Sequence, residues 1–227
     1  MPRVAYEYSL PRDIVKEHDI RKYGFHGTSH KSVISGIKGK TISCHLGNGS
    51  SITASVNGKV IDTSMGLTPT GGLVMATRVG DIDPGVIVYL SSLGYDMYDI
   101  VNKKSGFKGI SEYTDMLQVL ENIKDKEVKI AYDLFIYSIV KYIGSYAAVL
   151  NGVDNIIFTG GIGEHIAKVR YDVCKNLTYL GVEIEENPKF IGKVSNPIIS
   201  TKNSKVKVYV KDPKEEEQIV KEVLELL

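Results

Sequence analysis

The stretch GFHGTSH, residues 24–30, brings together two histidines, two glycines and two small hydroxyl residues. An imidazole can donate or accept a proton near neutral pH, and glycine lets a loop come close to a bound group. His26 could therefore belong to a catalytic loop. The competing interpretation is a polar turn in which this histidine bonds to Thr28 or Ser29. The stretch by itself leaves both open.

Three further residues could act on a charged substrate, and each has a structural alternative. His45 alternates with the apolar residues of its segment, so its side chain points away from their face, toward a site or toward solvent. Arg78 precedes an expected helix start, where an arginine usually pairs with a nearby carboxylate. Glu215 follows Asp212 by three residues, which is the spacing of a capping box. None of the three identifies a site alone.

Two glycine-rich turns follow expected strands, as HLGNGSS at residues 45–51 and FTGGIGEH at residues 158–165. Turns of this kind expose main-chain N–H groups, for which phosphate is a natural ligand. The first turn also fits a plain hairpin. The second resembles a dinucleotide-binding fingerprint, but the third glycine of that fingerprint would fall on Ile166, which weakens the interpretation.

The elements that must position these residues begin with strands. Apolar residues alternate over residues 42–46 and 52–56, and Asn57–Gly58 is typical of a type I′ hairpin turn. We expect three short antiparallel strands here. Helices follow, one capped by Asp83 with Pro84 at its first position, and one capped by Thr114 and reaching about Lys124.

A longer helix is expected over residues 126–150, ending at Asn151–Gly152, which is typical of a left-handed helix end. A buried strand, a glycine turn and a helix start are expected in NIIFTGGIGEH, then a strand over residues 206–210 and a final helix opened by Pro213. The order predicts one α/β domain, residues 41–227, with an N-terminal extension over residues 1–40.

The long helix is apolar on more than one face, so it is either buried centrally or covered by a partner. The side chains that need cover are Tyr132, Phe135, Ile136, Ile139, Tyr142 and Tyr146.

Composition bounds the class of protein. The 227 residues carry a net charge of +1 with scattered lysines, which argues against a nucleic-acid partner. Cys44 and Cys174 are too few for a disulfide framework, so a cytoplasmic location fits best. The most apolar stretch is interrupted by charged residues, and no membrane span is expected.

Six ordered motifs resemble the acetate kinase family, within the superfamily of acetate and sugar kinases, Hsp70 and actin. They are YGFHGTSH, CHLGNGSSI, DTSMGLTP, TRVGDIDPG, NKKSGFKGIS and FTGGIGE, and they cover residues 21 to about 165. The resemblance implies a ribonuclease H-like, actin-like ATPase α/β fold. It also implies reversible phosphoryl transfer from ATP to acetate, giving ADP and acetyl phosphate, with Mg²⁺ on the nucleotide, in a family usually found as homodimers.

The resemblance also assigns roles to single residues. His26 and Arg78 would stabilise the transition state, and Glu215 would help to hold magnesium. Three segments would contact the nucleotide: His45, Leu46, Gly47, Asn48 and Gly49; Asp115, Met116 and Leu117; and Gly161, Ile162, Gly163, Glu164 and His165.

The sequence departs from the family pattern in several places. A family member of ordinary size carries a further domain before the segment that matches MPRVAYEYSLP, and that domain would hold residues for magnesium and for the carboxylate. Leu117 stands where an arginine is usual, His165 where an asparagine is usual, and DPKEEEQIV replaces a TNEE pattern, so Glu215 and Glu216 are both candidate metal ligands. Alternatives are a non-catalytic ATP-binding fragment, a split-enzyme half that needs a separate N-terminal partner, and a kinase of propionate or butyrate.

Overall fold

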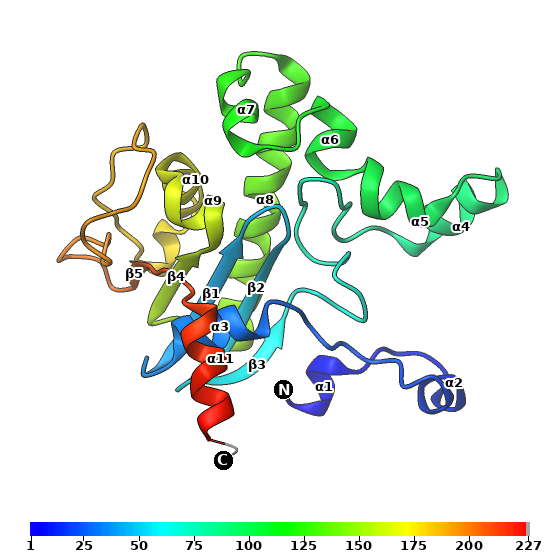
Figure 1. Ribbon diagram of the computed structural model, residues 1–227, viewed down its shortest axis with the longest axis horizontal. Coiled ribbons are helices and arrows are strands. Elements are labelled where there is room, and N and C mark those ends of the chain that lie inside the picture. Colours follow the sequence, from blue (N-terminus) through cyan, green and yellow to red (C-terminus); the bar gives the residue numbers. More distant parts are fainter. Residues whose placement is uncertain (226–227) are drawn as a thin grey trace.

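The computed structural model describes residues 1–225, and its centre is a five-stranded mixed sheet (Figure 1). In chain order the elements are α1 (Arg3–Tyr6), α2 (Arg12–Glu17), α3 (Gly27–Ile34), β1 (Lys40–Leu46), β2 (Ser50–Val56), β3 (Lys59–Thr63), α4 (Pro84–Ser92), α5 (Met97–Asp99), a π-helical turn (Ile100–Lys104), α6 (Gly106–Ser111), α7 (Met116–Glu121), α8 (Lys126–Val149), β4 (Asn155–Thr159), α9 (Gly160–His165), α10 (Ala167–Cys174), a 3₁₀ turn (Thr178–Leu180), β5 (Lys207–Val210) and α11 (Glu215–Leu224).

The strands run in the order β3-β2-β1-β4-β5. β1, β2 and β3 form an antiparallel meander, and β4 and β5 pair in parallel beside β1. Asn57 and Gly58 have φ values of 51° and 79°, which confirms the expected hairpin turn. The predicted order of an antiparallel meander, then helices, then further strands is therefore observed, and the structure adds that the later strands pair in parallel.

Helix α8 covers one face of the sheet. Asp125 caps its start by accepting from the N–H groups of Glu127 and Val128, and Asn151, with φ 54°, follows its end as the sequence predicted. The apolar residues of its inner face pack within the chain against β1 and β2 in one continuous core. Of the six side chains that needed cover, five are buried and Tyr142 is half-buried. These six side chains are therefore covered within the chain, whereas Leu134 and Tyr137 of the same helix are exposed.

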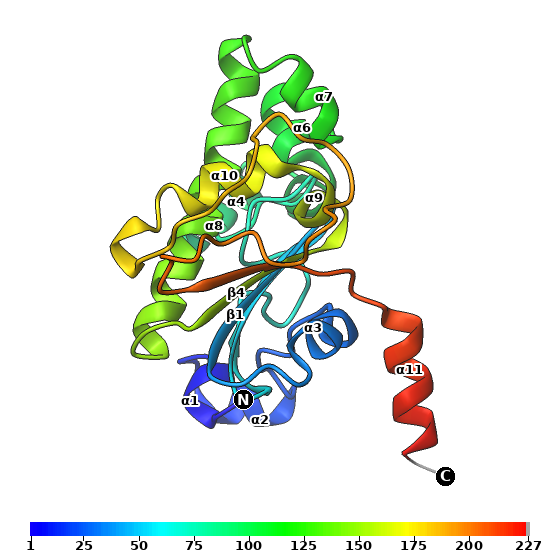
Figure 2. The same cartoon turned by 90° about the vertical axis from the view of Figure 1, so that its left-hand side faces the viewer.

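Helix α3 covers the opposite face, where Val33 and Ile34 pack against Ile157 of β4. Figure 2 shows α3 and α11 on one side of the sheet and α8 on the other. Helix α11 contacts α3, with Lys31 Nζ 2.8 Å from a carboxylate oxygen of Glu222. The sheet is therefore sandwiched between two helical layers, and its upper end in Figure 1, where β1 ends, carries the turns discussed below.

Two expected helix starts are corrected by the structure. Helix α7 is capped by Asp115, whose side chain accepts from Leu117 N, and not by Thr114. Helix α11 begins at Glu215 and not at Pro213, because Lys214 turns the chain with a left-handed φ of 41°. The Asp212 carboxylate accepts from Lys214 N instead of forming the expected capping box.

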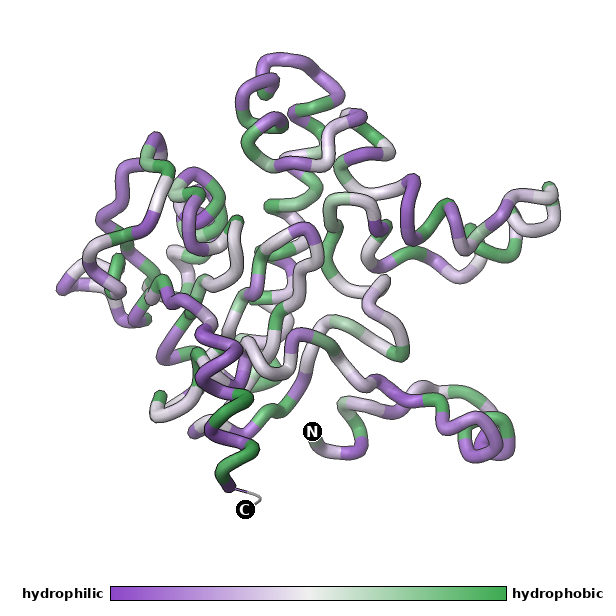
Figure 3. The backbone as a smooth tube through the Cα atoms, in the orientation of Figure 1, coloured by the Kyte–Doolittle hydropathy of each residue, from purple (hydrophilic) through white to green (hydrophobic). Residues whose placement is uncertain are grey.

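Helices α4 and α5 form an arm that extends away from the sheet (Figure 1). Asp83 caps α4 and Pro84 is its first residue, as predicted. Figure 3 shows hydrophilic and hydrophobic residues interspersed along this arm. No residue of α4 is buried. Within residues 1–225, no helix combines the length and apolar character needed to cross a membrane.

Candidate active site

His26 stands at the start of α3 in a left-handed conformation, with φ 60° and ψ 26°. This conformation is uncommon for a residue other than glycine, and such residues often lie at functional sites. Its ring is partly buried, and Nδ1 lies 3.0 Å from Ser51 Oγ. The bond to Thr28 or Ser29 that the polar-turn interpretation offered is replaced by a bond to the neighbouring strand.

His45, near the end of β1, stacks on His26. The ring centroids are 4.1 Å apart with an angle of 19° between the planes, and His45 Nδ1 bonds to Ser29 Oγ at 2.7 Å. The pKa of each ring is lowered to about 4, by burial for His45 and by burial together with the neighbouring His45 for His26. Both imidazole rings are therefore neutral at pH 7, and each carries one N–H group.

Arg78 reaches the same place from the loop between β3 and α4. Its Nη1 donates to the carbonyl of Pro69 at 3.3 Å and lies 3.8 Å from Met75 Sδ. The carboxylates nearest in sequence are used elsewhere: Asp81 accepts from Gly72 N and Tyr142 OH, and Asp83 accepts from Gly85 N. The guanidinium is partly exposed and faces the site instead.

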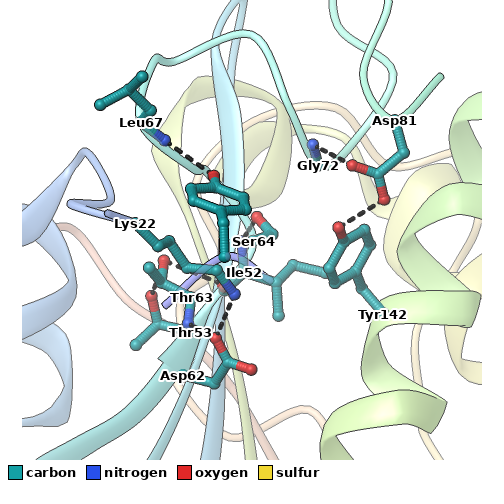
Figure 4. Close-up of polar contacts among 11 residues, drawn as sticks. Lys22, Ile52, Thr53, Asp62, Thr63, Ser64, Leu67, Gly72, Asp81 and Tyr142 are labelled. Carbon is teal, nitrogen blue, oxygen red and sulfur yellow. Dashed lines mark hydrogen bonds and ion pairs between the residues drawn. The ribbon is translucent and has the colours of Figure 1, made fainter. Parts of the chain in front are cut away.

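Figure 4 shows how the loop that carries Arg78 is fastened. Asp81 lies 2.8 Å from Gly72 N and 2.6 Å from Tyr142 OH of α8, so one carboxylate joins both sides of the loop to a core helix. Lys22 Nζ lies 2.7 Å from Asp62 of β3, which ties the segment before His26 to the same sheet. Two active-site segments are thus anchored to one rigid framework.

Gly49 marks the point where these segments converge. A Cβ added to Gly49 would lie 3.2 Å from Arg78 Nη1 and 3.4 Å from His26 Nε2. The absence of a side chain therefore lets the tip of the β1–β2 turn approach a guanidinium and an imidazole closely, and we call this point the junction at Gly49. A small anion or a phosphoryl group bound beside this junction would contact donors from three separate segments.

A cavity of about 400 Å³ opens beside this turn. Eight of the residues predicted to contact the nucleotide line it: Gly47, Asn48, Asp115, Met116, Leu117, Gly161, Ile162 and His165. Ile166 and Ile191 complete the lining. Ile166 directly follows a recognised motif, whereas nothing local in the sequence indicates Ile191, which reaches the cavity through a β-bridge with Ile166.

The other predicted contact residues lie around the cavity without lining it. His45 and Gly49 belong to the cluster described above, and Glu164 is buried, which raises the pKa of its carboxyl. Leu46 is fully buried in the core. A Cβ on Gly163 would touch Leu46 Cβ at 3.6 Å, so this glycine faces the core and not the cavity.

Gly160 brings the two glycine turns together. Its φ is +77°, and a Cβ there would lie 2.8 Å from the carbonyl oxygen of Leu46, too close for any side chain.

Arg170, which the sequence analysis did not single out, supports the second turn from the core. It is fully buried, donates to the Gly163 carbonyl at 2.7 Å and pairs with the Glu186 carboxylate. Removing one member of a buried pair costs about 3–5 kcal/mol.

Glu215, the candidate metal ligand, is the first residue of α11 and is exposed. Its negative charge partly opposes the lowering of the His26 pKa that burial and His45 cause. Across residues 1–225 no group of three or more His, Cys, Asp and Glu side chains could hold a metal ion. Mg²⁺ commonly takes only one or two carboxylates together with substrate phosphates, and an exposed carboxylate at the start of α11, from Glu215 or from Glu216, is compatible with such a site.

Known proteins resemble this chain in sequence and in fold. A sequence profile of the Acetokinase family matches residues 1–221. An acetate kinase of Carboxydothermus hydrogenoformans is 48% identical over 243 residues, covering 100% of this chain and 61% of that protein. A Porphyromonas gingivalis acetate kinase structure matches with a TM-score of 0.93 and 37% identity, covering 99% of this chain and 60% of that chain. A propionate kinase structure from Francisella tularensis matches with a TM-score of 0.88 and 41% identity, covering 98% and 60%.

The chain thus spans about three fifths of the length of these relatives. The structural matches confirm the actin-like ATPase fold that the motifs implied. Because the profile match extends over nearly the whole chain and the relatives share its sequence and its fold, the chain belongs to the acetokinase family.

Proposed function

We propose that this chain is the nucleotide-binding part of an acetate kinase, which transfers a phosphoryl group reversibly between ATP and acetate, giving ADP and acetyl phosphate. The observation that carries the proposal is the cavity lined by both glycine turns, the first of which approaches His26 and Arg78 at Gly49. The relatives named acetate kinase support it. In this proposal residues 41–227 bind the nucleotide, and residues 1–40 lead in from the remaining part of the enzyme.

The lining of the cavity suits a nucleotide. Met116, Ile162 and Ile191 offer apolar surface to a purine, and Asp115 and His165 offer polar groups to a ribose. The phosphates would extend along the main chain of residues 47–49 toward the junction at Gly49. The terminal phosphoryl group would then lie between Arg78 and His26, where transfer to a carboxylate would occur.

The charges of these residues suit the reaction. Phosphoryl transfer to acetate joins two anions, and the transition state carries its charge on the phosphoryl oxygens. Arg78 supplies a fixed positive charge and a planar pair of donors. His26 and His45, both neutral, can donate a hydrogen bond from the ring atom that faces the site. Mg²⁺ bound to the nucleotide would neutralise phosphate charge, and Glu215 would hold it, with Glu216 as the alternative ligand.

The test of nucleotide binding uses the chain itself. Calorimetry is expected to detect Mg-ATP or Mg-ADP binding, weaker than that of a complete enzyme. Gly161→Val should weaken binding by more than about tenfold, or about 1.4 kcal/mol, because Gly161 lines the cavity and its Cβ would point into open space. Ala148→Val, on the exposed surface of α8, is the control for added volume.

Two outcomes would contradict this prediction. One is the absence of heat at millimolar nucleotide from a chain that circular dichroism shows to be folded. The other is equal binding by Gly161→Val and Ala148→Val, which would place the nucleotide outside the cavity.

We also propose that the protein forms a homodimer and that the α4–α5 arm contributes to the interface. Val88, Tyr89 and Tyr98 are 69%, 63% and 69% exposed on this arm, a density of apolar surface that usually marks an interaction site. Light scattering should show a dimer, and Val88→Asp with Tyr89→Asp should shift it toward monomer. A monomer at high concentration of the unmodified chain would count against the proposal.

A second candidate function is a propionate or butyrate kinase, favoured by the structural match to the Francisella propionate kinase. A third is a half of a split enzyme, or an ATP-binding fragment without activity. An acyl-hydroxamate assay with acetate, propionate and butyrate would separate the acceptors. The enzyme for that assay is a chimera that joins the N-terminal part of the Carboxydothermus relative to this chain.

A further inference from the structure

A chain of hydroxyl and imidazole groups runs from His26 into the core. His26 Nδ1 lies 3.0 Å from Ser51 Oγ, and the same oxygen lies 2.8 Å from His30 Nε2. On the other side of that ring, His30 Nδ1 lies 2.8 Å from Ser43 Oγ. Ser43, His30 and Ser51 are all buried, so bulk water does not compete for these bonds.

Two arrangements of protons satisfy the three contacts with each serine hydroxyl donating, and a third, in which Ser51 accepts from both rings, leaves the buried Ser51 proton without an acceptor. Burial lowers the pKa of His30 to about 3, so its ring is neutral and carries one N–H. In the outward arrangement, Ser43 donates to His30 Nδ1, His30 Nε2–H donates to Ser51, and Ser51 donates to His26 Nδ1. In the inward arrangement every donor is reversed, and the proton of His26 lies on Nδ1.

The distances favour the outward arrangement. There, each proton of Ser43, His30 and Ser51 has an acceptor within 3.0 Å. In the inward arrangement the Ser43 hydroxyl must turn to the Thr53 carbonyl, at 3.5 Å, because His30 now donates to its oxygen. A contact of that length is at the limit of a hydrogen bond, and a poorly paired buried hydroxyl is unfavourable.

The arrangement decides what His26 presents to the site. His26 Nε2 lies at the junction at Gly49, next to Arg78 Nη1. With the proton on Nε2 this atom donates to a phosphoryl oxygen. With the proton on Nδ1 it presents a lone pair, which repels that oxygen.

We propose that His30 and Ser51 are positioning residues that fix the proton of neutral His26 on Nε2, so that His26 faces the site as a hydrogen-bond donor. The inference deepens the proposed phosphoryl transfer and rests on it for its meaning, but the proton arrangement can be measured without any activity.

The test is nitrogen-15 NMR of the five histidines of the full chain, labelled at the ring nitrogens. Two-bond correlations distinguish a protonated from an unprotonated ring nitrogen, and the loss of signals in His26→Asn identifies those of His26. The unmodified chain is expected to show His26 protonated at Nε2. In Ser51→Ala, the His26 nitrogen shifts should move toward the average of the two tautomers, because Nδ1 has lost its donor.

Ser55→Ala is the matched control. Ser55 is a buried serine on the same face of β2, and its hydroxyl bonds to the Thr41 carbonyl, away from the histidines. Its replacement should leave the His26 spectrum unchanged. A His26 protonated at Nδ1 in the unmodified chain would overturn the proposal even if Ser51→Ala does not fold. So would identical His26 shifts in folded Ser51→Ala and the unmodified chain.

A kinetic measurement separates this proposal from the proposed function. In the active chimera, Ser51→Ala should lower kcat while the KM for ATP changes little, since the donor is wanted mainly in the transition state. A loss confined to KM would overturn the role. A chimera without activity would contradict the proposed function, while the NMR result would still decide the proton arrangement.

Discussion

Replacing Arg78 with alanine is expected to lower kcat by about three to five orders of magnitude in the chimera described above, with a modest change in nucleotide binding. Arg78 Nη1 and His26 Nε2 meet at the junction at Gly49, where a Cβ on that glycine would lie 3.2 Å and 3.4 Å from them. The charge on the phosphoryl oxygens is greatest in the transition state, so the loss should fall on kcat. The acyl-hydroxamate assay with acetate, ATP and Mg²⁺ measures it.

Two variants sharpen this prediction. Arg78→Lys should restore little activity, because a point charge cannot reproduce the planar fork of donors. Arg12→Ala removes an exposed arginine that pairs with Glu7 at the surface, and should leave kcat unchanged. Full activity in Arg78→Lys would show that charge alone suffices, and near-normal activity in Arg78→Ala would remove Arg78 from the reaction.

The 227-residue chain alone is expected to form no significant acetyl phosphate, and addition of the N-terminal part of a complete relative should restore the activity. His26, Gly49 and Arg78 are all partly exposed to solvent in this chain. In-line transfer requires donor and acceptor to be held in contact, and such positioning supplies about 7–11 kcal/mol of barrier lowering. A half-site that admits water cannot hold acetate in this way.

The comparison requires protein free of the host's own acetate kinase. The same chain with Arg78→Ala, mixed with the added part, is the control, because its activity should remain near background. A rate from the unmodified chain alone that approaches the rate of a complete enzyme would refute this account of which residues are indispensable.

The sequence determined by itself the features that depend on neighbouring residues. Asn57–Gly58 sets a hairpin turn, Asp83–Pro84 starts α4, and Asn151–Gly152 follows the end of α8, each through local backbone preferences. The ordered glycine and histidine motifs are sufficient to predict the family and its fold. Local signals failed only where they competed, as at Asp115 and Lys214, which displaced the expected helix starts by one or two residues.

The tertiary structure alone decided which of these residues meet. The register of β1 and β2 sets Ser51 directly opposite His45, and the packing of α3 on the sheet brings His26 against both. Arg78 approaches from a separate loop, and Ile191 comes from a segment with no motif. Sequence spacing carries no information about such contacts, because they depend on strand pairing and helix packing between distant segments. The sequence therefore predicts what chemistry each side chain can perform, but it does not predict which other residues that side chain contacts.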